Sequence, residues 1–242
     1  MRIRLRFAKL GKVRWTSHRD VARMWERALR RVDLPVAYSA GFSPRPKVSF
    51  GLALSTGHES VAEYLDVDLD SPESELDVAD LPARLSPALP VGVDVLAAAH
   101  IEPRTPSLQE AVTSCTWRIE VPDRSPADLA VLVERALGAD ELMVTRERKG
   151  HEVTDDLRPA ILSLELAGRT ARGTELEAEL AIQTRSVRPA ELLRALSLGL
   201  PAPCGNGLEE GSVCRTHQWI ETPDGARFEP LPLAPHAVER AS

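Results

Sequence analysis

The chain has 242 residues, of which 43% are hydrophobic and 27% are charged, and its formal net charge at pH 7 is −6. This composition is typical of a folded globular protein and excludes a disordered chain. No apolar run reaches the roughly 18 residues that a membrane-spanning helix needs. The first residues alternate charged and bulky side chains and lack the apolar run of a signal peptide, so we expect a cytoplasmic protein without a membrane segment.

The positive charge is concentrated at the start of the chain. Residues 1–50 contain thirteen Lys or Arg and three Asp or Glu, which gives this segment a charge of +10 and leaves −16 for the other 192 residues. Such an uneven distribution is typical of a surface that binds an anion or a polyanion. We therefore expect an anionic partner, and RNA is the leading candidate.

The three cysteines indicate neither a metal site nor a disulfide framework. Cys115 stands alone, and the spacing between Cys204 and Cys214 matches no zinc motif. The closely spaced cysteines that hold an iron–sulfur cluster are also absent from the sequence. We therefore predict reduced thiols, no metal ligands and no cofactor bound by this chain.

The first predicted elements are a strand and a helix. Residues 2–7 alternate apolar and arginine side chains, which predicts a strand with one packed face and three arginines on the other. Ser17, with Asp20 three residues later, is typical of a helix start. The helix should run to about Val32, because Pro35 follows soon after.

This helix should have two distinct faces. At 100° per residue, Trp25 and its apolar neighbours share one side. The opposite side carries a stripe of arginines at positions 19, 23, 27 and 30. A solvated helix face normally mixes charges of both signs, so the stripe favours anion binding over plain solvation.

The remaining elements of the first half give the order β-α-β-β-(β)-α-β, in which the strand in parentheses is additional. Strands are predicted around 36–39, 48–52, 63–69 and 91–96, and a short helix at 75–89. Between the first two of these strands lies a loop at 41–47, which two prolines hold open. This order predicts a ferredoxin-like split βαβ domain.

The second half repeats the plan. Strands are predicted at 115–121, 141–148, 160–167, 174–184 and 212–221, with helices at 126–137 and 189–198. We therefore predict an α+β protein made of two ferredoxin-like domains in tandem. The expected boundaries are 1–102 and 113–222, followed by a Pro-rich, loosely held tail at 223–242.

Basic and aromatic residues of the first half are the candidates for binding. The predicted phosphate contacts are Lys9, Arg14, Arg19, Arg23, Arg45 and Lys47. Arginine suits this role because its planar guanidinium can hold two phosphate oxygens. Tyr38 and Phe42 could stack on bases, although such residues more often belong to the core. A weaker second basic cluster comprises Arg146, Arg148, Lys149, Arg158 and Arg188.

His18 is the one histidine in this basic segment. It could accept the 2′-hydroxyl proton of an RNA while arginines hold the phosphate, as in metal-independent RNA cleavage. The helical wheel, however, places His18 on the side of Trp25, which favours a structural histidine with hydrogen bonds. Direct contact with a substrate is the third interpretation.

Two segments resemble a known family. They are KLGKVRWTSHRD at 9–20 and LPVAYSAGFSPRP at 34–46, with weaker agreement continuing to Val187-Arg188-Pro189. They resemble the radical SAM-linked family, a domain of unknown function that is fused to a radical SAM protein or encoded beside one. The resemblance implies a radical SAM protein as partner, and that partner would hold the iron–sulfur cluster.

The leading hypothesis is an accessory protein without catalytic activity. It would bind RNA, or another anionic substrate, and present it to a radical SAM enzyme. The first alternative is a metal-independent endoribonuclease that uses His18. The second is a protein-docking module that binds an acidic partner and no nucleic acid.

Overall fold

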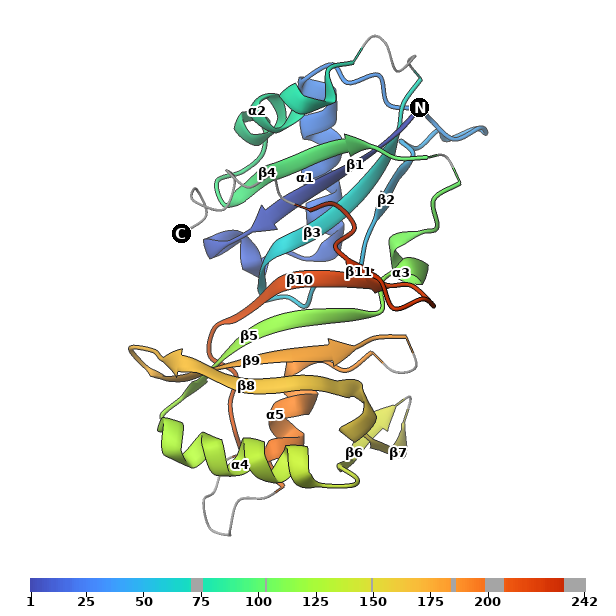
Figure 1. The fold of residues 1–242 in the computed structure, drawn as a ribbon. Coiled ribbons are helices and arrows are strands. Elements are labelled where there is room, and N and C mark those ends of the chain that lie inside the picture. Colours follow the sequence, from blue (N-terminus) through green and yellow to red (C-terminus); the bar gives the residue numbers. More distant parts are fainter. Residues whose placement is uncertain (71–75, 103, 149, 184–185, 199–206, 233–242) are drawn as a thin grey trace. The chain divides into compact units, whose positions relative to one another are not determined.

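The computed structural model describes residues 1–70, 76–102, 104–148, 150–183, 186–198 and 207–232. It is a mixed α+β protein (Figure 1), as the sequence predicts. The chain divides into two compact units. The first unit comprises Met1–Val112 together with Ile220–Ser242, and the second comprises Thr113–Trp219.

The first unit contains an antiparallel sheet with two helices. Its main elements are β1 (Arg2–Lys9), α1 (His18–Arg31), β2 (Val48–Phe50), β3 (Glu59–Asp68), α2 (Leu81–Leu85) and β4 (Val93–His100). Short helical turns lie at Gly11–Trp15, Val78–Asp80, Ser86–Ala88 and α3 (Leu108–Ala111). The strands are ordered β4-β1-β3-β2, and each neighbouring pair is antiparallel.

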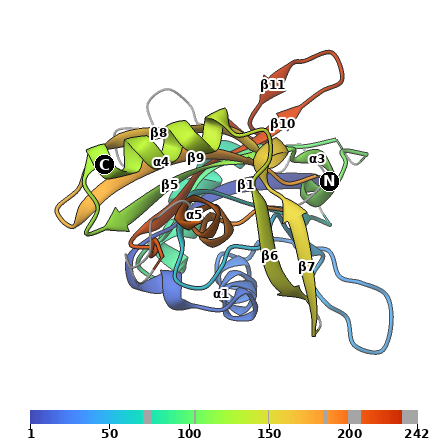
Figure 2. The same ribbon diagram turned by 90° about the horizontal axis from the view of Figure 1, so that it is seen from below.

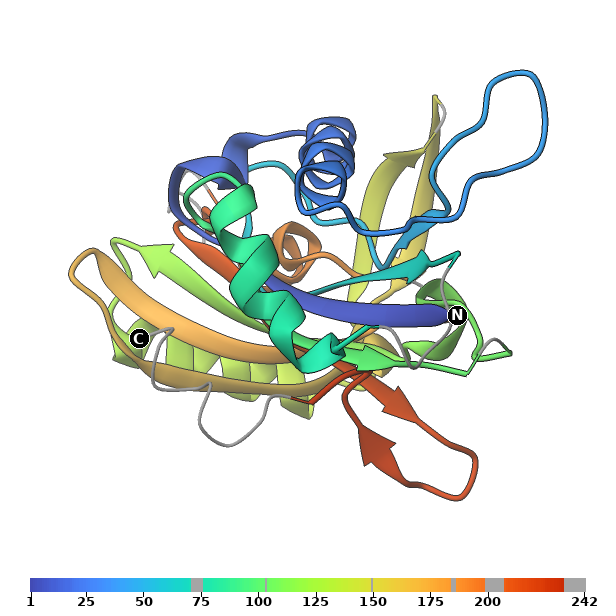
Figure 3. The ribbon, with the colours of Figure 1, turned by 90° about the horizontal axis from the view of Figure 1, so that it is seen from above.

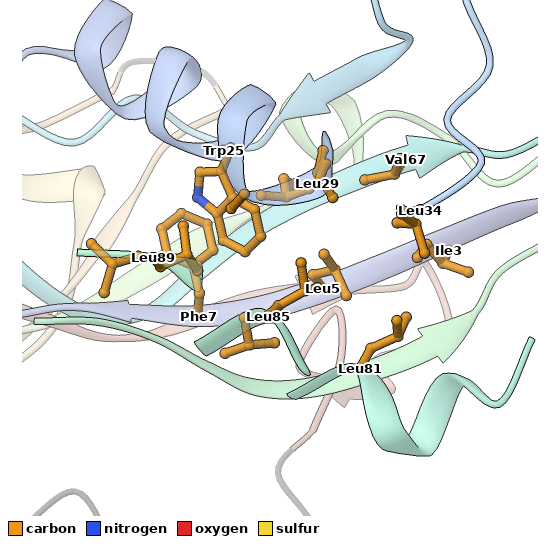
Figure 4. Packing of buried hydrophobic residues seen from close by; sticks show 14 of the residues in the cluster. Ile3, Leu5, Phe7, Trp25, Leu29, Leu34, Val67, Leu81, Leu85 and Leu89 are labelled. Atoms are coloured by element: carbon orange, nitrogen blue, oxygen red, sulfur yellow. The ribbon is translucent and has the colours of Figure 1, made fainter. Parts of the chain in front are cut away.

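One face of β1 forms the core of this unit. Ile3, Leu5 and Phe7 alternate along the strand and are fully or almost fully buried. They pack against α1, where the ring of Trp25 lies edge-on to that of Phe7 at 5.0 Å between centroids. Figure 4 shows these side chains with Leu81 and Leu85 of α2 in the same cluster. The predicted apolar alternation of β1 is thus confirmed, and burial of these side chains holds α1 and α2 on the sheet.

The other face of β1 is not exposed to solvent, so the expectation that it presents its arginines was wrong. Arg4 and Arg6 retain 3% and 2% of their accessible surface. Arg4 donates from Nε and Nη2 to the two carboxylate oxygens of Asp66, at 2.7 and 2.9 Å. Arg6 donates from Nη1 to Glu229 at 2.8 Å and to the carbonyl of Leu231 at 3.2 Å. Ion pairs and carbonyls compensate the burial of both guanidinium groups.

Helix α1 begins and ends where the sequence predicts. Ser17 is the N-cap: its hydroxyl accepts from the backbone N–H of Asp20 and donates to the Asp20 carboxylate at 2.6 Å. This short hydrogen bond lowers the pKa of Asp20 below its ordinary value, with a smaller contribution from Arg23. After the helix, Asp33 has a φ of +52°, in the left-handed region that ends helices.

The second unit has the same order of elements with one addition. Its elements are β5 (Ser114–Pro122), α4 (Pro126–Gly138), β6 (Met143–Arg148), β7 (His151–Asp156), β8 (Ile161–Arg169), β9 (Gly173–Ala181), α5 (Pro189–Ser197) and β10 (Val213–Glu221). A short turn, Arg158–Ala160, precedes β8. The sheet order is β10-β5-β9-β8, and β6 and β7 form a separate two-stranded sheet, visible in Figure 2. The sequence did not predict β7, because its polar residues HEVTDD lack an apolar alternation.

The segment after β10 is held against the first unit, which corrects the expectation of a loose tail from residue 223. β11 (Arg227–Phe228) pairs with Ile220 and Glu221 at the end of β10. Beyond it, the carboxylate of Glu229 and the carbonyls of Pro230 and Leu231 accept from arginines of β1. Composition alone suggested a mobile tail, whereas buried charge requires these acceptors. Residues 233–242 lie outside the described part of the chain.

Candidate nucleic-acid interface

The arginine stripe of α1 is solvent-exposed. Arg19, Arg23, Arg27 and Arg30 are all exposed, because Trp25 and Leu29 direct the opposite face of the helix into the core. Arg23 has one carboxylate nearby, that of Asp20 at 3.8 Å. Within the described part of the chain, the other three arginines of the stripe form no ion pair. Their charge is therefore available to a ligand.

A loop between α1 and β2 carries the predicted aromatic residues. Figure 3 shows this segment extending away from the sheet of the first unit. Its base is fixed by a β-bridge between Tyr38 and Pro46 and by hydrogen bonds in both directions between Ser39 and Arg45. At its far end Phe42 is fully exposed, and Tyr38 is half exposed. The core interpretation of Phe42 is therefore wrong.

Arg45 and Lys47 lie on the same loop and are exposed. Neither side chain forms an ion pair within the residues that the structure describes. Together with the four arginines of α1, they form what we call the basic surface: Arg19, Arg23, Arg27, Arg30, Arg45 and Lys47. Two exposed aromatic rings accompany these cations, which is a common composition of single-stranded nucleic-acid sites.

A groove connects the end of α1 with the base of this loop. Its volume is about 250 Å³, and its lining residues come from α1, from the turn after it and from the loop. They are Glu26, Leu29, Arg30, Asp33, Leu34, Val36, Tyr38 and Pro46. The groove places Arg30 of the stripe beside Tyr38, so the two parts of the basic surface are neighbours. The sequence did not predict this groove. It forms where the chain turns after α1, at the left-handed residue Asp33.

Arg14 is less available than the sequence suggested. Its Nη1 forms an ion pair with Glu59 at 3.1 Å, and its guanidinium lies over the ring of Trp15 at 5.4 Å from the centroid. Trp15 itself retains 64% of its accessible surface and covers Gly57. A phosphate would have to compete with Glu59 for this guanidinium. The exposed indole is an aromatic surface that the sequence analysis did not consider.

Lys9 is not part of the exposed surface, which corrects its assignment as a phosphate contact. Its side chain is buried, and Nζ donates to the carbonyls of Arg14 and Thr16 at 3.2 and 3.3 Å. Desolvation lowers the pKa of this amine, and the nearby charge of Glu63 partly opposes that shift. The hydrogen bonds hold the short turn that leads into α1, which is a structural role.

His18 is exposed at the first position of α1, so the expectation of a core residue was wrong. Its ring meets that of Phe50 edge-on, with centroids 5.3 Å apart. It lines a small pocket of about 20 Å³ that also includes Lys9 and Glu63. Among the described residues its imidazole has no hydrogen-bond partner, so it is free to contact a ligand.

Two arginines of the second basic cluster are occupied by internal contacts. Arg146 forms ion pairs with Asp155 at 3.3 Å and Glu191 at 3.7 Å. Arg158 donates to the carbonyls of Leu137 and Ile161. Lys149 lies outside the described residues. Arg146 and Arg158 therefore add little free charge to a binding surface.

The described residues contain no group of side chains with the arrangement of a metal site. Cys115 is buried and Cys214 is partly buried, and neither forms a disulfide within the described residues, whereas Cys204 lies outside them. No helix in the described ranges is long and apolar enough to cross a membrane.

Comparisons with known proteins identify a family and a distant structural likeness. A family model described as an uncharacterized protein conserved in bacteria (DUF2344) matches residues 2–189. No curated protein matches the chain. Among solved structures, a chain from the crystal structure of a Cbf5-Nop10-Gar1 complex is similar, with 12% identity and a TM-score of 0.46. The match covers 89% of this chain and 48% of that one, so this chain spans about half of its length.

Proposed function

The chain belongs to the DUF2344 family of uncharacterized proteins conserved in bacteria, and we propose that it is an RNA-binding accessory protein of a radical SAM enzyme. The observation that carries the RNA-binding part is the basic surface, whose cations are exposed and, apart from Arg23, lack a carboxylate partner in the described residues. The enzyme partner rests on the resemblance of residues 9–20 and 34–46 to the radical SAM-linked family.

The spacing of the stripe suits an extended polyanion. Arg19 and Arg30 are eleven residues apart, which corresponds to about 16 Å along a helix. This length exceeds the size of one phosphate and allows contacts with several phosphates of one strand. Because guanidinium groups bind phosphate oxygens in pairs, the stripe would fix the position of a strand without reading its sequence.

The exposed aromatic rings favour unpaired RNA over a duplex. Bases in single strands and loops can stack on aromatic side chains, whereas those inside a helix cannot. Phe42 and Tyr38 lie on the loop that also carries Arg45 and Lys47. A strand whose phosphates meet these cations would place its bases next to the rings.

We also propose that both units are ferredoxin-like split βαβ domains. Each has the order β-α-β-β-α-β, with β6 and β7 as an insertion in the second unit. In both, the last strand lies beside the first, and the first beside the third, in antiparallel sheets. This arrangement supports a duplicated domain.

Endoribonuclease activity is the second candidate function, and the exposure of His18 favours it. The imidazole could accept the proton of a 2′-hydroxyl, whose oxygen would then attack the adjacent phosphorus. The 5′-oxygen of the next nucleotide would leave with a proton taken from water, and a 2′,3′-cyclic phosphate would remain. Basic residues would stabilise the negative charge that develops on the non-bridging phosphate oxygens. His18→Ala should abolish such cleavage and leave RNA binding intact.

Binding of a fluorescent single-stranded RNA at several salt concentrations tests the proposal. Arg19→Ala, Arg45→Ala and Lys47→Ala should each weaken binding across RNA sequences and reduce the salt slope by about one. Arg194→Ala, which removes an exposed arginine from α5 of the second unit, is the matched control and should change neither quantity. If the unmodified protein binds no RNA at low salt, the proposal fails, and an acidic protein becomes the expected ligand of the basic surface.

The enzyme partnership has a separate test. A radical SAM protein encoded beside the gene should retain the full-length chain on an affinity column, with and without added RNA. Retention that nuclease treatment abolishes would indicate that RNA alone connects the two proteins. Absence of retention under both conditions would overturn the partnership while leaving RNA binding in place.

A further inference from the structure

The groove beside the basic surface has the chemistry of a selective nucleobase site. We propose that it binds one unpaired guanine of the RNA, an inference that rests on the RNA binding proposed above and adds to it the base that is read.

The groove has an apolar and aromatic lining that suits a flat base. Leu29 and Leu34, which are almost fully buried, line it together with Tyr38, half of whose surface remains exposed. A volume of about 250 Å³ lies just under the usual range for sites that hold drug-sized ligands. The groove is therefore large enough for one base. Stacking on an aromatic side chain contributes to the affinity for any base.

Two carboxylates at the groove distinguish between bases. Within the described residues, neither Glu26 nor Asp33 has an ion pair or a hydrogen bond to its side chain, although Arg30 lines the same groove. An ionised carboxylate only accepts hydrogen bonds. Guanine is the RNA base whose Watson–Crick edge carries two adjacent donors, N1–H and the 2-amino group. Adenine, cytosine and uracil place an acceptor next to their donor, and a carboxylate repels an acceptor.

Asp33 is held in place by the backbone. Its left-handed conformation follows α1 directly, its N–H donates to the carbonyl of Arg30 at 3.2 Å, and the N–H of Leu34 donates to Leu29 at 3.1 Å. A carboxylate on a fixed turn loses little freedom when it binds a base, which favours selectivity. Arg30 at the groove and Arg45 and Lys47 on the loop can receive the flanking phosphates.

The test uses the full-length protein and RNA octamers of uridine in which one central position is varied. The four central bases are guanine, adenine, inosine and 7-deazaguanine, and the dissociation constants are measured at one salt concentration. Guanine should bind about tenfold more tightly than adenine, because a bidentate pair discriminates by that order. Inosine lacks the 2-amino donor and should lose most of this advantage. 7-Deazaguanine, which has a carbon in place of N7, should bind as tightly as guanine.

Substitutions locate the preference in the groove. Asp33→Asn, which keeps a residue that tolerates a left-handed conformation, and Glu26→Gln should reduce the preference for guanine without changing the salt slope. Tyr38→Leu should weaken binding of all four octamers. Glu134→Gln, at an exposed position of α4 in the second unit, is the control and should leave the preference unchanged.

The outcomes separate this inference from the proposed function. Equal binding of all four octamers, or a preference for adenine, would overturn the guanine site while RNA binding stands. A guanine preference that survives both carboxylate substitutions would show that other residues recognise the base, and it would also overturn the guanine site. Absence of binding to every octamer would overturn the proposed function and this inference with it.

Discussion

Trp25 is completely buried between α1 and β1, and its indole Nε1 has no acceptor among the described residues. An unsatisfied buried donor lowers stability by about 1–3 kcal/mol. The residue is nevertheless well suited to its position, because its ring packs edge-on against that of Phe7 within the apolar cluster of the first unit (Figure 4). Trp25 thus stabilises the fold through apolar packing, whereas its unsatisfied Nε1 lowers the stability.

Substitution of Trp25 separates these two effects. Trp25→Ala should lower the free energy of unfolding by about 3–5 kcal/mol, because it removes a large side chain from a closed core. Trp25→Phe keeps an aromatic ring and removes the unsatisfied donor, so its cost should be about 1 kcal/mol. Urea unfolding measures both, with Trp15→Phe as the control at an exposed tryptophan of the same unit. Equal costs for the two Trp25 variants would show that Nε1 does have a partner.

Among the charged residues, burial rather than sequence position separates structural from available cations. Lys9 and Arg6 are buried and donate to acceptors of the protein itself. Arg19 and Arg45 are exposed and have no such acceptor in the described part of the chain. Substitution of the first kind should therefore destabilise the protein, and substitution of the second kind should reduce ligand binding.

At the scale of elements, α1 and α4 begin in the same way. Ser17 and Ser125 each accept from the backbone N–H three residues later and donate to the aspartate there, at 2.6 and 2.7 Å. These hydrogen bonds lower the pKa values of Asp20 and Asp128. The two helices therefore have equivalent N-caps, but only α1 carries arginines of the basic surface.

Removal of the two caps should have equal effects on stability and different effects on binding. Ser17→Ala and Ser125→Ala should each lower the free energy of unfolding by about 1 kcal/mol at neutral pH. Ser17→Ala should in addition weaken RNA binding, because the first turn of α1 carries Arg19. A fluorescence assay of RNA binding beside urea unfolding compares the variants. A binding defect of the same size in Ser125→Ala would contradict the placement of the RNA on α1.

The capping aspartates also predict how stability depends on pH. Their carboxyl pKa values are lowered in the folded state, so the charged forms contribute stability above the ordinary value of 3.8, and this contribution is lost as the pH falls through the lowered values. The difference between the wild type and Ser17→Ala should accordingly shrink at acidic pH. Unfolding curves at neutral pH and near pH 3 measure it, and a difference that grows towards acid would contradict the assignment.

At the scale of the whole molecule, the first unit is completed by residues from both ends of the chain. Arg6 and Glu229 are 223 positions apart and form a buried ion pair at 2.8 Å. Removal of one partner of such a pair leaves a buried charge without compensation, which is more costly than the pair itself. The segment at 227–231 is therefore a structural part of this unit.

Two truncations test this role. A chain that ends at Thr222 should lose several kcal/mol of stability, since Arg6 would lose Glu229 and Arg4 would lose the carbonyl of Pro230. A chain that ends at Pro232 keeps these acceptors and should unfold close to the full-length protein. Thermal unfolding of both compares them. Equal stability of the two truncated chains would show that the contacts of residues 227–231 contribute nothing.

The sequence by itself determined the α+β class, the bounds of α1 and the exposure of its arginine stripe. These follow from features within one element: the alternation of β1, the cap at Ser17 and the helical periodicity that directs Trp25 inward. Hydrophobic periodicity states which side of an element is apolar, and burial of that side follows from the hydrophobic effect.

Only the tertiary structure decided whether the polar sides of these elements are buried or exposed. The arginines of β1 alternate as regularly as those of a solvated strand, yet Arg4 and Arg6 are buried and donate to Asp66 and to residues 229–231. Lys9 looks like the exposed lysine of a turn, yet its amine is enclosed by carbonyls, and Phe42 looks like a core residue, yet it stands in solvent at the end of a loop. In each case the environment depends on whether segments from outside the element pack against the residue, and no local pattern encodes their position.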